Sequence, residues 1–495
     1  MRTALTAVAL LALVAVTAVG TRTEHIFDGR SGWPLLWWTA GAWALFALAF
    51  LALRRVRGRA AGTLLVVGAV LMAGIGVVGP PNTSTDSARY AWDGIVSDAG
   101  VSPYAHVPVD DALDPLRVPW LFPSPVPGAS GAAACPQLRT DPVRSLPAGD
   151  LLCSTLNRSA VPTIYPPVAQ GWFATVRAAV PVTAQYWPMQ VGGALVSLLT
   201  GLALAVVLRR RRLDVRWAAL WAWSPFVTTE AVTNSHIDAL GVLLVVLATA
   251  VATPLVAAGV ARHGSSGGRG RAAAVGALVG LSAAVKFVPV IAAPPLARRR
   301  PFTVAAAAIV TFAAVYVPYV VTTGWSVVGY LPGYLKEQGY DGGSGFTLAS
   351  WVLPGSLATV VSLAAIVVIA ALSFWRADPD RPWLAQLAGT GAILLVVSPP
   401  YAWYALVVVP FVALTRRWEW LVLPLTMTAH MLVPAVFVSR TMTLVAVGVV
   451  LAGWLVRRYA ARRPDDDARP SAVARDDGGG APDPRRDPLS EGRTA

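Results

Sequence analysis

The sequence has 495 residues, of which 55% are hydrophobic and only 13% are charged, with a mean hydropathy of +0.58 and a net charge of +14. A soluble globular protein carries roughly 25% charged residues, so this chain cannot cover itself with a polar surface and lipid must be its solvent. Its arginines stand in short clusters between apolar runs, without zinc-finger spacing or an RNA-binding aromatic signature, which excludes a nucleic-acid partner.

Runs of apolar residues predict an all-α, polytopic bundle of transmembrane helices. By the length that a span needs we expect about 12 spans, at residues 3–20, 34–53, 61–79, 188–208, 216–232, 238–260, 302–322, 347–374, 383–398, 402–415, 419–438 and 441–456. Residues 1–60 hold two of them as an N-terminal pair, and the first also fits a signal-like segment. The main bundle covers residues 61–463, and a disordered cytoplasmic tail is expected at 464–495, which is rich in Pro, Asp, Gly and Arg.

The arginine clusters orient the chain. They lie at residues 54–59, 209–212, 262–271, 298–300, 376–381, 416–417 and 457–463, and the positive-inside rule places them in the cytoplasm together with both termini. Residues 80–187 then form a large first loop outside the plasma membrane. The two cysteines, Cys135 and Cys153, both lie in this loop, where a disulfide is chemically allowed and two free thiols are the alternative.

One stretch does not fit a simple alternation of spans. The basic clusters at 262–271 and 298–300 are separated by fewer residues than the about 40 that two crossings need. We therefore expect a re-entrant pair of half-helices, broken near Lys286 and Pro289. A lysine at membrane depth indicates a functional site, whereas a lysine that snorkels to the interface is the alternative.

The start of the outer loop gathers charged groups at helical spacing. If the segment TSTDSARYAWDG is helical, Asp86, Arg89, Tyr90 and Asp93 share one face. A carboxylate there can take a proton from an acceptor hydroxyl, and an arginine can bind phosphate oxygens in a bidentate way. A solvated helix with an internal Asp–Arg pair is the alternative.

A second polar island, EAVTNSHIDALG, lies at the outer end of two predicted spans and holds Glu230, Asn234, His236 and Asp238. His236 and Asp238 are two residues apart and do not face each other on a helix, although they could converge in a turn. This set supplies too few ligands to predict a metal site.

A third island is the outer turn SPPYAWY at residues 398–404. Its rings, Tyr401, Trp403 and Tyr404, suit stacking on a sugar, and an ordinary interfacial aromatic belt is the alternative. The sequence contains no P-loop, GxSxG, HExxH or dinucleotide-binding motif, so nothing in it favours soluble-enzyme chemistry.

Several motifs, taken in order, are similar to those of a known superfamily. They are DSARYAWDG, AGVSPYAHVP, PTIYPPVAQ, NSHIDALG, GLSAAVKFVPVIAAP and SPPYAWY, spread over residues 80–410. The chain thereby resembles the GT-C membrane glycosyltransferases, and within them the actinobacterial polyprenol-phosphate-mannose-dependent mannosyltransferases. The family's catalytic loop usually follows the first span, whereas here it follows the third, a departure that two extra N-terminal helices would explain.

The resemblance implies an inverting transfer of mannose from a polyprenyl-phosphate donor to a hydroxyl of a cell-envelope glycan or glycolipid, on the extracytoplasmic side. It implies Asp86 as general base, with Asp93 as second choice, and Arg89 and Lys286 as groups that bind the departing phosphate. Substrate contacts are expected from Tyr90, Tyr165, His236, Asp238, Tyr401, Trp403 and Tyr404. No cofactor is expected, while a divalent metal stays open. Transfer of arabinose, and a transporter or flippase, are the alternative functions.

Overall fold

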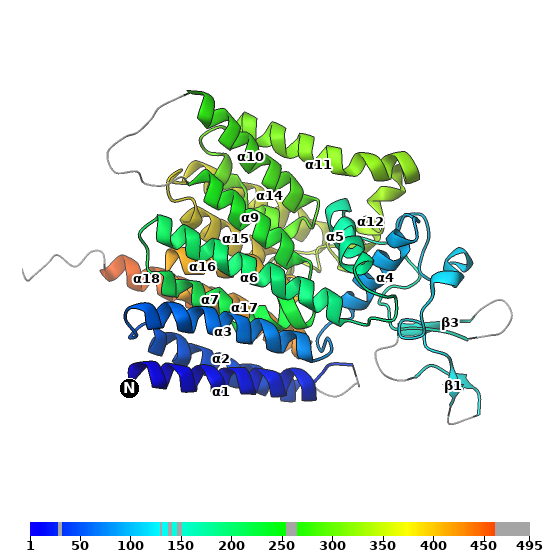
Figure 1. Ribbon diagram of the computed structural model, residues 1–495. Coiled ribbons are helices and arrows are strands. Elements are labelled where there is room, and N and C mark those ends of the chain that lie inside the picture. The colour runs from blue at the N-terminus through cyan, green and yellow to red at the C-terminus, as the bar shows by residue number, and fades with distance from the viewer. Residues whose placement is uncertain (28–31, 129–130, 137–140, 146–150, 254–264, 461–495) are drawn as a thin grey trace, which may run out of the picture. The chain divides into compact units, whose positions relative to one another are not determined.

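The computed structural model of the protein describes residues 1–27, 32–128, 131–136, 141–145, 151–253 and 265–460. Helices dominate these residues (Figure 1). Residues 1–450 form one compact unit and 451–495 a second, of which the last turns of one helix are described. The tail predicted to be disordered, residues 464–495, lies outside the described residues.

Seven helices in the described part of the chain are long and apolar enough to cross a membrane. They are α1 (Arg2–Thr23), α2 (Trp33–Leu53), α3 (Arg59–Val78), α6 (Trp187–Arg210), α11 (Pro301–Thr323) with the residues that follow it, α14 (Gly355–Trp375) and α18 (Val436–Ala460). A pair bent by 116°, Pro225–Thr233 and α9 (Asp238–Ala252), brings the number to eight if it counts as one span. The prediction of an all-α, multi-pass membrane protein is therefore confirmed, but the prediction of about 12 spans is not.

The surplus predicted spans are short or broken helices. Residues 383–398 form α15 (Trp383–Val397), and residues 402–415 form a 3₁₀ turn followed by α16 (Val409–Thr415). Every residue from 402 to 414 is buried. The apolar character of this run is therefore explained by the protein that packs around it. By contrast, only 6% of the apolar window that contains α11 is buried inside the protein, as a lipid-facing helix requires.

Other short elements complete the bundle. They are α7 (Ala219–Ala222), α8 (Pro225–Val227), a π-helix (Thr228–Thr233), α12 (Leu331–Glu337), α13 (Thr347–Ser350) and α17 (Val422–Leu432). The predicted spans at 216–232 and 419–438 thus resolve into several pieces. The N-terminal helices α1, α2 and α3 lie side by side, and α3 also packs against α6 (Figure 1).

The predicted break near Lys286 is present in a different form. Helix α10 (Ser265–Ala283) is one full helix and not a half-helix, and the chain then returns through two 3₁₀ turns, Val288–Ala292 and Pro294–Ala297. Prolines inside the return remove the N–H groups that an α-helix needs. The return places Arg300 against Gly268, which brings described residues of the two basic stretches together.

Residues 80–187, the segment predicted to lie outside and called the outer segment below, join the end of α3 to the start of α6. It contains α4 (Asp86–Asp98), a 3₁₀ turn (Asp111–Leu116), α5 (Pro167–Ala178) and two antiparallel ladders, β1 (Val126–Pro127) with β2 (Ala133–Ala134) and β3 (Asp141–Ser145) with β4 (Leu151–Ser154). A disulfide joins Cys135 to Cys153, which are the two residues that the sequence offers for it. Helix α4 packs so closely on α5 that a Cβ at Gly94 would lie only 2.6 Å from the Phe173 carbonyl oxygen.

Candidate active site

A cavity of about 590 Å³ opens beside the first turn of α4. Its charged lining groups are Asp86, Arg158 and Lys286. Aromatic side chains form a second part of the lining: Tyr165, Tyr334, Tyr340, Tyr401, Trp403 and Tyr404. Aliphatic residues and phenylalanine form a third part: Phe287, Val288, Ile291, Leu331, Leu335, Ile393, Leu394 and Val397. A largely apolar cavity with a few converging charged groups is typical of a binding or catalytic site.

Asp86 is the first residue of α4, and its side chain reaches the cavity. Asn157 Nδ2 donates to one of its carboxylate oxygens at 2.6 Å, and His236 Nδ1 lies 3.6 Å from the other. Burial alone would raise the pKa of the Asp86 carboxyl, but His236, Lys286 and Asn157 together outweigh burial and hold that pKa below its usual range. Asp86 is therefore ionised at neutral pH and able to accept a proton.

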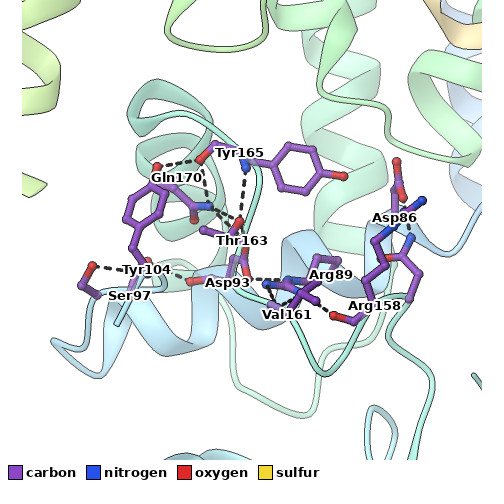
Figure 2. Close-up of polar contacts among 12 residues, drawn as sticks. Asp86, Arg89, Asp93, Ser97, Tyr104, Arg158, Val161, Thr163, Tyr165 and Gln170 are labelled. Carbon is purple, nitrogen blue, oxygen red and sulfur yellow. Dashed lines mark hydrogen bonds and ion pairs between the residues drawn. The ribbon is translucent and has the colours of Figure 1, made fainter. Parts of the chain in front are cut away.

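Arg89 and Asp93 bind each other instead of lining the cavity. Arg89 Nε donates to Asp93 Oδ1 at 2.9 Å, while Thr163 and Gln170 donate to Asp93 Oδ2 at 2.6 and 3.0 Å. Arg89 also donates to the carbonyl oxygens of Arg158 and Val161, and Figure 2 shows this network apart from Asp86. The internal Asp–Arg pair of the alternative is found, but the helix that carries it is buried and not solvated. The network fixes the segment that carries Arg158, so the predicted roles of Arg89 in phosphate binding and of Asp93 as second-choice base lose their geometric support.

His236 and Asp238 diverge to different partners. His236 lies between Asp86 and Glu230, whose Oε2 atom is 3.3 Å from His236 Nε2, and its ring stacks on Trp403 with centroids 3.8 Å apart. Asp238, the first residue of α9, accepts from Lys286 Nζ at 2.7 Å. Neither His236 nor Asp238 lines the cavity, but each contacts a residue that does, Asp86 and Lys286 respectively.

Lys286 lies at the turn after α10, where the helix ends and the 3₁₀ return begins. Its ammonium group faces the ring of Tyr404 at 4.9 Å from the centroid and that of Trp403 at 6.0 Å. An ammonium group has three N–H donors, and Asp238 accepts from one of those of Lys286. Lys286 is therefore a cation that is held in place at the wall of the cavity.

Arg158 is a cavity residue that the sequence analysis did not single out. Its guanidinium pairs with Glu337 at the end of α12, with Nε 3.0 Å from Oε2, and its Nη2 lies 3.5 Å from the Tyr401 hydroxyl. Arg158 has a φ of 50°, which turns the chain sharply after Asn157. The pairing partner lies 179 residues away, so no local spacing pointed to this arginine.

The predicted aromatic residues fall into two groups. Tyr401, Trp403 and Tyr404 lie at the cavity, where the rings of Tyr401 and Trp403 stack with centroids 4.6 Å apart. Tyr165 also lines the cavity. Tyr90 does not, because it is fully buried against Phe173, although its hydroxyl lies 3.4 Å from Asp86 Oδ2. The described residues contain no group of three or more His, Cys, Asp or Glu side chains placed to hold a metal ion.

Comparison with known families bears on this cavity. Residues 163–399, slightly less than half of the chain, match the model of glycosyltransferase family 87. This match indicates a membrane glycosyltransferase. The matched glycosyltransferase region contains Tyr165, His236, Asp238 and Lys286, whereas Asp86 precedes it. No curated protein and no solved structure matches the chain significantly.

Proposed function

We propose that this protein transfers mannose from a polyprenyl-phosphate donor to a hydroxyl of a cell-envelope glycan or glycolipid, with inversion at the anomeric carbon. The observation that carries the proposal is the make-up of one cavity, which combines a carboxylate, two cations, a set of aromatic rings and an apolar wall. Each of these parts matches one part of such a reaction. Mannose, in preference to arabinose, follows the resemblance of the sequence motifs.

The donor is bound by the cations and the apolar wall. Lys286 and Arg158 stabilise the phosphate, whose negative charge grows as it departs. The polyprenyl chain lies against aliphatic residues such as Leu331 and Ile393, and the sugar ring lies against Tyr401 and its neighbours. A lipid-borne donor needs no nucleotide-binding domain, which accords with the absence of such a motif from the sequence.

Asp86 acts as the general base. It takes the proton of the acceptor hydroxyl while the acceptor oxygen forms a bond to the anomeric carbon. The bond from that carbon to the phosphate oxygen breaks, and the polyprenyl phosphate leaves with the electron pair. Asp86 is the only carboxylate among the described residues that line the cavity, which favours a single displacement, because retention by double displacement needs a second group as nucleophile.

We propose further that the reaction takes place on the outer side of the plasma membrane. Asp86 follows the end of α3 that lies opposite the arginine cluster at 54–59, and the positive-inside rule puts that cluster in the cytoplasm. The disulfide between Cys135 and Cys153 in the same outer segment is typical of an oxidising compartment.

The test is a transfer assay with membranes that contain the full chain, radiolabelled polyprenyl-phosphate mannose and an envelope glycolipid extract. We expect Asp86→Asn to lower transfer by about 100-fold or more, as loss of a general base does. Asp98→Asn, an exposed position on the same helix, is the matched control and keeps full activity. If the protein transferred sugar only from polyprenyl-phosphate arabinose, arabinose would replace mannose as the proposed donor sugar. Full transfer by Asp86→Asn would overturn the mechanism.

A further inference from the structure

His236 lies between two separate cavities. On one side its Nδ1 atom faces Asp86, which lines the large cavity, and on the other its Nε2 atom faces Glu230, which lines a smaller cavity of about 40 Å³. The His236 side chain has no exposed surface and lines neither cavity. A line of three titratable side chains thus crosses the wall between the two spaces.

The backbone is built to hold this line. Glu230 lies in the π-helix Thr228–Thr233, and Ser235 has a φ of 57° at the bend that follows. Six positions along a regular α-helix would turn Glu230 and His236 to different faces, so the π-helix and the bend together bring them into contact. Stacking on Trp403 fixes the imidazole plane from the large-cavity side. These irregular features converge on one contact between side chains.

The smaller cavity is lined by residues of α1 and α2 and has both polar and apolar lining residues. Its hydroxyl- and amide-bearing lining residues are Thr17, Thr21, Thr39, Asn82, Thr83, Thr229 and Thr428. Within the described part of the chain, nothing completes a hydrogen bond to the buried Thr17 hydroxyl or to Glu230 Oε2. With these polar groups in its wall, a cavity of about 40 Å³ can hold water, which needs roughly 10–15 Å³. The C-terminal end of α1 and the N-terminal half of α2 line this cavity. Both lie on the same side of the bundle as the outer segment.

We propose that Glu230, His236 and the small cavity form a proton exit path from Asp86; this inference rests on the proposed function. After sugar transfer, the proton of the acceptor hydroxyl is on Asp86, and the large cavity is still filled by product. The neutral imidazole of His236 receives the proton of Asp86 on its Nδ1 nitrogen, and the imidazolium formed in this way gives its Nε2 proton to Glu230. Glu230 then releases a proton to water in the small cavity. Asp86 returns to the carboxylate, and one proton has passed from it to water. His236 is left neutral with its proton on Nδ1, and this proton must return to Nε2 before the next transfer.

The test separates the first turnover from later ones. Glu230→Gln keeps the size and polarity of the side chain but cannot carry the proton. With enzyme in excess over donor, we expect its first transfer to stay within about twofold of wild type, while steady-state turnover falls about tenfold. Thr17→Leu, which fills the small cavity from α1 without touching Asp86, is expected to show the same split and decides the matter if Glu230→Gln does not fold.

Other outcomes overturn the exit path. An equal fall in the first turnover and in the steady state gives Glu230 a positioning role only, and unchanged rates in both phases remove any role. The same experiment distinguishes a failure of the proposed function, because wild-type protein that transfers no sugar in the first turnover lacks the reaction itself.

Discussion

Replacing Asp93 with asparagine separates a structural role from a catalytic one. The Asp93 carboxylate accepts from Arg89, Thr163 and Gln170 and is only 1% exposed. In Asp93→Asn, the N–H groups of the new amide would face at least one of these donors, which would then lose its hydrogen bond. The Arg89 guanidinium, which is 4% exposed, would also lose its counter-charge. Removing one partner of a buried ion pair costs about 3–5 kcal/mol, so we expect a loss of stability of this size.

The assay is thermal unfolding in detergent, with transfer activity measured on the folded fraction. Asp98→Asn is the control, because that carboxylate is exposed on the same helix. The double variant Arg89→Met/Asp93→Leu is expected to recover part of the stability, since replacing both charges of a buried pair by apolar groups is often neutral. An Asp93→Asn protein that melts at the wild-type temperature but transfers no sugar would refute this reasoning and make Asp93 the base.

Two further substitutions test the cavity. Lys286→Met should raise the KM for the lipid donor by about tenfold or more, because a charge-assisted contact to phosphate is lost. The control Lys336→Met, on the exposed side of α12, should leave that KM unchanged. Equal KM values for Lys286→Met and wild type would show that Lys286 does not bind the donor. Asn157→Leu deletes a hydrogen bond that helps to lower the pKa of Asp86, so that pKa rises. Asp86 works as a carboxylate, so activity is lost as the pH falls through the pKa of Asp86. In Asn157→Leu the acidic limb of the kcat/KM profile should therefore move to higher pH. An acidic limb at the wild-type position would contradict a role for the Asn157 contact.

The sequence predicted the membrane architecture well but overcounted its spans, for a physical reason. Hydropathy measures whether a residue avoids water and not whether lipid or protein surrounds it. Residues 402–414 are as apolar as a span, yet all are buried inside the bundle, while α11 and α14 present most of their apolar surface outward. Length was the better guide, since α15 and α16 are both shorter than a bilayer requires.

Within the site, local spacing was informative and distant pairing was not. The condition set by the sequence analysis, that this segment is helical, is met, and Asp86, Arg89 and Asp93 lie on one helix, α4. Helical periodicity did not show that Thr163 and Gln170 would hydrogen-bond to Asp93, since Thr163 lies in the chain that leads into α5 and Gln170 lies in α5 itself. Arg158 was missed for the same reason, because its carboxylate partner comes from α12.

The bent pair set a similar limit. The motif NSHIDALG was recognised, yet its geometry depends on a π-helix and on a positive φ at Ser235, neither of which has a clear sequence signature. Asn234 in this motif accepts from the backbone N–H groups of Asn82 and Thr83, which anchors the start of the outer segment. The motif therefore sets where α4 begins, a function that its spacing alone did not suggest.

The central claim is that Asp86 performs chemistry in a cavity that binds a lipid-linked sugar. It is tested most directly by measuring donor binding and sugar transfer on the same Asp86→Asn protein reconstituted in lipid, with photo-crosslinking of a polyprenyl-phosphate mannose analogue as the binding readout. We predict crosslinking equal to that of wild type, since Lys286 and Arg158 remain, together with transfer that is lowered by about 100-fold or more. Transfer at the wild-type rate, or crosslinking at a site remote from this cavity, would contradict the account.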